Sequence, residues 1–326
     1  MKRRLRISLW ILLFTCVAIA IGVAYATEHI LPYAPIRPNR VTTLDLTKIY
    51  GSEVTPSSVG LDYTTFDVVV PAHYLLKGKD SITLRGWFVK SAIEPSHGTV
   101  ILLHGIANSR VSMIPMAKAL ADRGFNSILY DSRANGSSEG SDCTFGYYEK
   151  HDVRRFIDAA EVRFPGPTPY AIFGNSLGAS VAVQTLAIEP RLTCAVVESP
   201  FASLREVIHD YFTRMFILPL YFIPNRALVH SERIAHFQVD SVAPAESARF
   251  VTQPLMVAHG LTDAHISSNY GKRVFDNARS SHKMWHPVVG GTHFNLSELG
   301  GKAYQTMVTN FFVDNVPQKR ENVTGP

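Results

Sequence analysis

The chain has 326 residues, of which 46% are hydrophobic and 18% charged, a composition typical of a globular protein with one strongly apolar segment. Its formal net charge of +5 includes four residues at the extreme N-terminus, Lys2, Arg3, Arg4 and Arg6, so the remainder carries about +1 (5 − 4). No basic patch is left to indicate a nucleic-acid partner, and no spacing of Cys and His residues indicates a metal site.

The basic N-terminus is followed by an uncharged apolar stretch, residues 7–26. About twenty helical residues span roughly 30 Å, enough to cross the core of a bilayer. We therefore expect a signal anchor over residues 1–26, with the N-terminus in the cytoplasm and the rest of the chain outside it, because positive residues precede the span. The alternative is a signal peptide removed near Ala26, since Ala24-Tyr25-Ala26 resembles a cleavage site; the length of the stretch favours the anchor.

Beyond this segment the pattern changes from linker to alternating strands and helices. Residues 27–61 are rich in Pro, Ser and Thr, and we expect an extended linker with little regular structure. Strands are then predicted at 66–70, 82–89, 100–103, 127–130, 171–173, 194–197, 255–258 and 284–289, and helices near 113–120, 153–160, 177–188 and 304–312. Continuous apolar strands alternating with helices predict an α/β fold with a mostly parallel sheet covered on both faces. We assign this domain to residues 62–318 and a flexible tail to 319–326.

The interval 201–250 interrupts the alternation, and residues 211–224 within it are rich in large apolar side chains. We expect a small helical cap here, which could cover a site and line an apolar pocket. A helix that only packs onto the domain is an equal alternative. Contact of this apolar surface with a membrane is a third.

A possible nucleophile lies at Gly174-Asn175-Ser176-Leu177-Gly178, between a predicted strand and a predicted helix. A serine on such a tight turn projects from the carboxyl edge of the sheet, and the helix N-terminus behind it favours developing negative charge. The pentapeptide alone is a common pattern, so the interpretation depends on partners elsewhere in the chain.

Other strand ends supply these partners, because functional groups in parallel sheets collect beyond the carboxyl ends of the strands. Asp263 follows the strand at 255–258, and His293 lies on a glycine-rich loop after the strand at 284–289. The order Ser176, Asp263, His293 matches a nucleophile–acid–base order, so we predict His293 as the general base, oriented by Asp263. Glu198, beyond another strand, is the alternative acid, and a turn or helix-cap role is the alternative for Asp263.

Backbone amides are predicted to complete the site. Gly105 lets the chain turn after the strand at 100–103, so we assign the N–H groups of Ile106 and Leu177 to an oxyanion hole. His104 on the same turn is interpreted as structural rather than as the base. His259 and His265, which flank Asp263, are interpreted as turn or surface groups.

Taken together, these patterns resemble the serine α/β-hydrolases, close to the exported or membrane-anchored bacterial branch related to esterases, monoacylglycerol lipases and S33 serine aminopeptidases. The resemblance runs over about residues 66–313 and is carried by LLHGIANSR, YDSRANGSSEG, FGYYEKHDV, IFGNSLGAS, VESPFASL, VAHGLTD and GGTHFNL. Asp131, Arg133, Gly136 and Ser138 fit the family's Asp-x-Arg-Gly-x-Gly-x-Ser loop, in which Ala134 replaces the first glycine. We interpret that loop as structural and entrance-lining.

The resemblance implies an α/β-hydrolase fold and a serine hydrolase that cleaves a carboxylic ester or thioester through an acyl-enzyme, without a metal or organic cofactor. The expected substrate is a small acyl ester or a lipid-like molecule, and the N-terminal helix would hold the enzyme at a membrane. A peptidase or amidase of the aminopeptidase type and a non-catalytic, membrane-tethered binding protein remain alternatives. Cys143 and Cys194 are expected to be free thiols, although one disulfide is conceivable in an exported domain.

Overall fold

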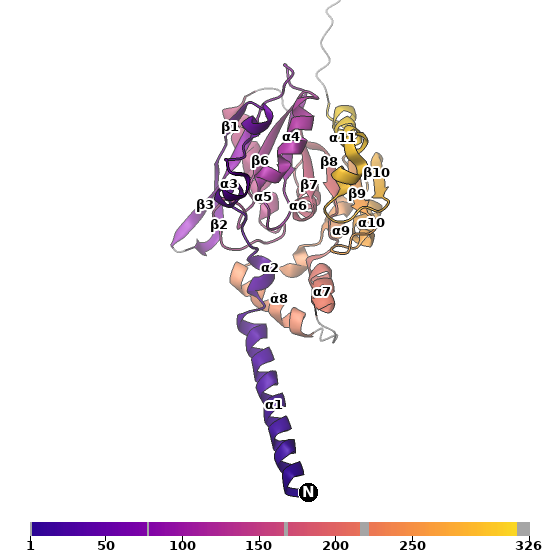
Figure 1. Ribbon diagram of the computed structural model, residues 1–326. Helices are drawn as coiled ribbons and strands as arrows, with labels where there is room; N and C mark the ends of the chain where they lie inside the picture. The colour runs from indigo at the N-terminus through magenta and orange to yellow at the C-terminus, as the bar shows by residue number, and fades with distance from the viewer. Residues whose placement is uncertain (1, 77, 166–168, 216–221, 318–326) are drawn as a thin grey trace, which may run out of the picture.

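A central eight-stranded sheet organises the computed structural model, which describes residues 2–76, 78–165, 169–215 and 222–317 (Figure 1). The strand order is β1-β4-β6-β5-β7-β8-β9-β10. The strands are β1 (Tyr63–Thr65), β4 (Gly86–Val89), β5 (Gly98–Leu103), β6 (Phe125–Tyr130), β7 (Tyr170–Asn175), β8 (Leu192–Glu198), β9 (Leu255–Gly260) and β10 (Lys283–Val288). β5 to β10 pair in parallel, whereas β4 is antiparallel to both β1 and β6. The predicted, mostly parallel α/β sheet is confirmed.

A separate hairpin of β2 (Val68–Leu76) and β3 (Lys79–Leu84) lies between β1 and β4 along the chain. The single strand predicted at 82–89 is therefore two strands, because β3 belongs to the hairpin and β4 to the main sheet. The backbone changes sheets next to Gly86, where a Cβ atom would lie 2.6 Å from the carbonyl oxygen of Phe66. Residues on both sides of the break are buried, Leu84 before it and Trp87 after it, which is why the apolar pattern hides the break.

Helices cover both faces of the sheet. α4 (Ile114–Ala121) and α11 (Leu296–Asn315, interrupted at Gly301) pack on one face. α5 (Glu149–Arg163), α6 (Leu177–Leu186) and α10 (Ser268–Asn277) pack on the other. In β5, Ile101 and Leu103 join the α5–α6 core while Val100 and Leu102 join the α4–α11 core. Strands buried on both faces read as continuous apolar runs, which is why they could be predicted.

The described part of the interval 201–250 contains helices and no strand, as the break in the alternation predicts. It consists of α7 (Leu204–Met215), α8 (Phe222–Ala235), η3 (Val239–Ser241), α9 (Pro244–Ser247) and η4 (Ala248–Phe250). Residues 216–221 of the apolar run lie outside the described residues, as does the predicted tail at 319–326. We call α7 and α8 the cap; they lie between the sheet and the N-terminal helix (Figure 1).

The N-terminal helix α1 (Lys2–His29) extends away from the rest of the molecule (Figure 1). Residues 3–25 are exposed along it, and the helix is long and apolar enough to cross a membrane by length and composition. Such a helix suits a membrane anchor or a signal sequence.

The expectation of little regular structure over residues 27–61 is wrong. This segment continues α1 and then forms α2 (Tyr33–Ile36), α3 (Thr43–Tyr50) and η1 (Pro56–Val59). At the start of α3, the hydroxyl of Thr42 accepts from the backbone of Asp45, whose carboxylate accepts in return from the Thr42 amide. Residues that resemble a linker in composition thus serve here as helix caps. Ile36, only 1% exposed, holds the segment on the domain.

The loop after β6, which carries the family pattern at 131–138, is held by a buried ion pair. Arg133 donates from Nε and Nη2 to the two carboxylate oxygens of Asp152 on α5, at 2.8 and 2.6 Å. Both side chains are almost completely buried. Burial raises the pKa of Asp152, and the Arg133 guanidinium opposes that rise. Asp131 is paired in the same way with Arg110, so the contacts of this loop support its structural interpretation.

Replacing Arg133 by Met should leave the carboxylate of Asp152 buried without its partner. We expect a loss of about 3–5 kcal/mol in the free energy of unfolding, measured by urea titration of the full chain in detergent. Lys118→Met is the matched control, because Lys118 pairs with Asp122 on an exposed surface and its loss should cost less than about 1 kcal/mol. Equal effects of the two substitutions would contradict the role of the buried pair.

Candidate active site

Ser176 stands at the sharp turn between β7 and α6. Its backbone angles, φ 54° and ψ −113°, are strained for a residue with a side chain. The amide of Ser176 donates to the carbonyl of Glu198 at the end of β8, at 2.8 Å, which holds the turn against the sheet. The serine hydroxyl is thereby placed at the carboxyl edge of the parallel strands.

The two glycines of the pentapeptide are required by close backbone contacts. A Cβ atom at Gly174 would lie 2.2 Å from the carbonyl oxygen of Gly178. A Cβ atom at Gly178 would lie 2.3 Å from the carbonyl oxygen of Leu103 in β5. Only residues without side chains allow the turn to pass this close to the central strand.

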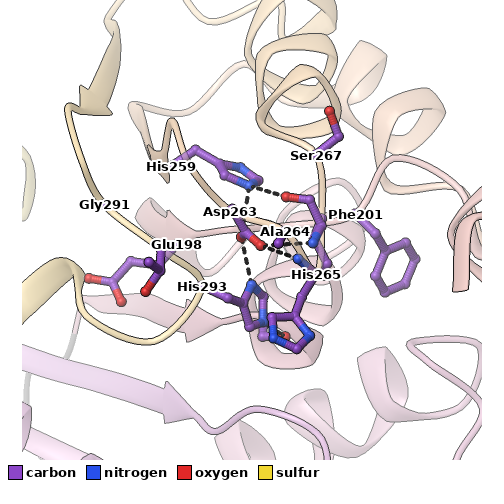
Figure 2. A network of polar contacts seen from close by, with 12 residues as sticks. Glu198, Phe201, His259, Asp263, Ala264, His265, Ser267, Gly291 and His293 are labelled. Atoms are coloured by element: carbon purple, nitrogen blue, oxygen red, sulfur yellow. Dashed lines mark hydrogen bonds and ion pairs between the residues drawn. The ribbon is translucent and has the colours of Figure 1, made fainter. Parts of the chain in front are cut away.

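The structure brings Ser176, Asp263 and His293 together. His293 Nε2 lies 2.8 Å from Ser176 Oγ, and His293 Nδ1 lies 2.7 Å from Asp263 Oδ2. Figure 2 shows the imidazole of His293 directed at the carboxylate of Asp263. Asp263 comes from the loop after β9 and His293 from the loop after β10. Because β9 and β10 are neighbours in the sheet, their loops bring the two side chains together.

A second histidine also contacts the carboxylate of Asp263 (Figure 2). His259 Nε2 lies 3.3 Å from Asp263 Oδ2, and the amides of His265 and Ile266 donate to Asp263 Oδ1 at 2.8 Å each. Burial by itself would raise the pKa of Asp263, but the hydrogen bonds from His259, His293 and Ile266 outweigh it and hold that pKa well below its usual range. The site therefore contains a fixed negative charge.

The interpretation of His259 as a turn or surface group is wrong, because its side chain is fully buried in β9. No local sequence signal reveals this burial, because His259 follows the last apolar residue of the run, Ala258, and precedes Gly260. His265 is exposed, as expected of a surface group, and its ring centroid lies 5.6 Å from that of His293.

His104 and Glu198 have other partners. His104 Nδ1 lies 2.7 Å from the Gly105 carbonyl oxygen, and its Nε2 lies 3.0 Å from the Ser132 amide. His104 Nε2 accepts a hydrogen bond here, as in a neutral imidazole, and burial lowers the pKa of this histidine. The Glu198 carboxylate accepts from the Tyr304 hydroxyl at 2.7 Å and from the side-chain amide of Asn175 at 3.2 Å. Burial raises the pKa of Glu198. Asp263, and not the alternative acid Glu198, is the carboxylate hydrogen-bonded to His293.

Comparison with known proteins identifies the fold. A model described as serine aminopeptidase, S33, matches residues 94–243, just under half of the chain. The structure of the Pyrococcus furiosus esterase Pf2001 matches with a TM-score of 0.67 at 20% identity, over 87% of this chain and 99% of that one. The chain has the α/β-hydrolase fold.

Two curated relatives extend the similarity of this α/β-hydrolase beyond the matched family model. The lysophosphatidylserine lipase ABHD12 of Gallus gallus is 23% identical over 308 residues, which cover 86% of this chain and 77% of that protein. The uncharacterized protein YqkD of Bacillus subtilis is 22% identical over 277 residues, covering 83% of this chain and 86% of that protein. These alignments extend well past the boundaries of the family model on this chain.

The two residues whose amides are assigned to an oxyanion hole, Ile106 and Leu177, lie beside Ser176. Leu177 is the first residue of α6. The backbone amides in the first turn of a helix have no acceptor carbonyl within that helix, and the Leu177 amide is one of them. Along the loop after β5, the amide of Ala107 already donates to Asn135 Oδ1 at 3.0 Å. Ile106 and Leu177 both line the same cavity as Ser176.

Two cavities adjoin this site, one lined by Ser176 and the other by His293. One, of about 420 Å³, is almost entirely apolar and has walls from the cap and from the segment after α1. It is lined by Leu31, Ala34, Pro35, Ile106, Phe145, Ser176, Leu177, Phe201, Val207, Ile208, Tyr211, Phe212, Met215, Pro224, Ala227, Leu228 and Ile266. The other, of about 290 Å³, includes His293 and more polar groups, among them Asn108, Ser112, Asn175, Glu198, Ser297 and Gln305.

Gly178→Ala should disturb the turn, since its new methyl group would have to displace the backbone of β5. We expect a loss of about 1–3 kcal/mol in the free energy of unfolding, as for other overpacked positions. Gly22→Ala is the matched control, because nothing lies within 4 Å of a Cβ atom at that position on α1. Wild-type stability of Gly178→Ala in urea would disprove the close contact.

Asp263→Asn should reveal the fixed charge through the pH dependence of stability. The pKa of Asp263 is lower in the folded chain than the value of about 3.9 of an unfolded chain, so its contribution is present above that pH and lost as the pH falls toward the folded value. We expect the stability advantage of wild type over the variant to be larger at pH 6 than at pH 3. Urea titrations at both values measure it, and an advantage that grows toward pH 3 would refute the direction of the shift.

Proposed function

We propose that this α/β-hydrolase cleaves a carboxylic ester or thioester with an apolar acyl group, through a Ser-His-Asp triad and an acyl-enzyme. The observation that carries the proposal is the continuous line of hydrogen bonds from Ser176 through His293 to Asp263, next to an apolar cavity. The similarity to the Pyrococcus furiosus esterase and to the ABHD12 lipase agrees with ester chemistry.

In the proposed reaction, Ser176 Oγ attacks the substrate carbonyl while His293 Nε2 takes its proton. Asp263 orients the imidazole and stabilises the imidazolium that forms. The amides of Ile106 and Leu177 would donate to the oxyanion of the tetrahedral intermediate. His293 then returns the proton to the leaving oxygen or sulfur, and a water molecule activated by the same base releases the acyl group from Ser176.

The two cavities suggest how the ester is placed. An acyl chain suits the apolar cavity, which contains Ser176 and both proposed oxyanion amides. The leaving group must receive a proton from His293, and the more polar cavity that includes His293 lies on that side. We therefore infer an ester whose acyl part is apolar and whose alcohol part is polar.

The N-terminal helix α1 is proposed to anchor the enzyme in a membrane, with the N-terminus in the cytoplasm and the catalytic domain outside it. Basic residues before the apolar span support this orientation. Removal of the helix near Ala26 is the alternative, and would yield a secreted or periplasmic form.

A peptidase of the aminopeptidase type is the second candidate, favoured by the description of the matched family model. Such an enzyme needs an acidic group to bind the substrate amine on the acyl side of the scissile bond. None of the described residues that line the apolar cavity carries a carboxylate. The ester is for this reason the better-supported substrate.

Ser176→Ala and His293→Ala should each lower kcat for ester hydrolysis by a factor on the order of 10⁶, or to the detection limit. Hydrolysis of a panel of acyl esters and of aminoacyl amides measures this, together with covalent labelling by a fluorophosphonate. The matched control is His282→Ala, an exposed histidine with wild-type activity expected.

Three outcomes would count against the proposal. Wild-type rates of ester hydrolysis in both Ser176→Ala and His293→Ala would contradict the assignment of the triad. Faster cleavage of aminoacyl amides than of esters would favour the peptidase. Absence of labelling at Ser176 would favour a non-catalytic binding protein.

A further inference from the structure

The segment that follows α1 contributes part of the apolar cavity. Leu31, Ala34 and Pro35 line it together with residues of the cap and with Ser176. These three residues precede the stretch matched by the family model, which begins at residue 94. We call residues 31–35 the juxta-anchor wall.

The juxta-anchor wall is fastened to the cap. Ser231 on α8 is fully buried, and its hydroxyl donates to the carbonyl oxygen of Pro32 at 2.7 Å. Arg226 on the same helix pairs with Glu28 at the end of α1, at 2.7 Å. α8 contacts both α1 and α2, and Figure 1 shows these elements side by side. The wall therefore holds a defined position against the cap.

The other side of this segment is fastened to the body of the domain. The amide of Cys143 donates to the carbonyl oxygen of Ile36 at 2.7 Å, and Arg37 pairs with the buried carboxylate of Asp142 at 2.7 Å. Ile36 packs in the core beneath α5 and α6. The segment that presents Leu31, Ala34 and Pro35 to the cavity is therefore held from two sides.

We propose that the juxta-anchor wall determines which acyl chains the hydrolase accepts, with Leu31 as a specificity-determining residue. This inference rests on the proposed ester hydrolysis at Ser176. A side chain that fills part of an apolar pocket excludes the longer or bulkier acyl groups that need the same space, while a short acyl group at Ser176 needs only the space nearest the nucleophile. Selectivity for the acyl chain would thus reside in the segment that joins the domain to α1.

The test compares full-length Leu31→Trp with Ile30→Trp in detergent micelles, using esters of one alcohol with acyl chains from acetyl to long-chain. Ile30 is the neighbouring aliphatic residue, is 57% exposed and does not line the cavity. For Leu31→Trp we expect kcat/KM to fall about tenfold or more for the longest esters and to stay near wild type for the acetyl ester. Ile30→Trp should match wild type across the panel.

A second variant, Leu31→Ala, keeps the experiment informative if the larger side chain impairs folding. It enlarges the cavity, so the chain length with the highest kcat/KM should shift upward. An unchanged length profile in both variants, a uniform fall at all lengths, or the same change in Ile30→Trp would each overturn the inference. Failure of the proposed function has a different signature: wild type would hydrolyse no ester of the panel, or Ser176→Ala would hydrolyse them all equally well.

Discussion

The close passage of the Ser176 turn beside β5 is the constraint on which the rest of the site depends. Gly178 passes so near the carbonyl of Leu103 that the start of α6 has one possible position relative to the central strands. The strained backbone of Ser176 persists because the surrounding sheet fixes it, through the hydrogen bond from its amide to Glu198. Ser176 is therefore placed by backbone contacts, largely independently of the side chains around it.

The other two loops are placed by a similar device. The amide and the hydroxyl of Thr262 both donate to the carbonyl oxygen of Gly291, at 2.9 and 2.8 Å, and a Cβ atom at Gly260 would lie 2.4 Å from that oxygen. The loop of Asp263 and the loop of His293 are thus joined through their backbones as well as through the contact between these two side chains. Preorganisation of this kind keeps the imidazole within reach of both Ser176 and Asp263 without a change of structure.

The sheet and the three residues at its edge could be predicted because their signals are local. Buried parallel strands are continuous apolar runs, and Asp263 and His293 directly follow two of them. The helices at residues 27–61 and the burial of His259 could not be predicted in this way. Thr42 and its neighbours have the composition of a linker, and the contact that fixes Pro32 comes from Ser231, 199 positions later. His259 is recognisable only when the loop containing Asp263 folds back over β9.

The attachment of the cap to the start of the domain bears on proteolytic processing. A cut after Ala26 would shed the apolar helix but leave Glu28 for Arg226 and the Pro32 carbonyl for Ser231. The released domain would carry its complete cavity into solution, so anchored and shed forms would share one preference among esters. A cut only ten residues further along the chain would remove Leu31, Ala34 and Pro35 from the cavity, together with the contacts that the cap makes to this segment. The position of cleavage, and not merely its occurrence, would decide whether a shed form keeps its selectivity.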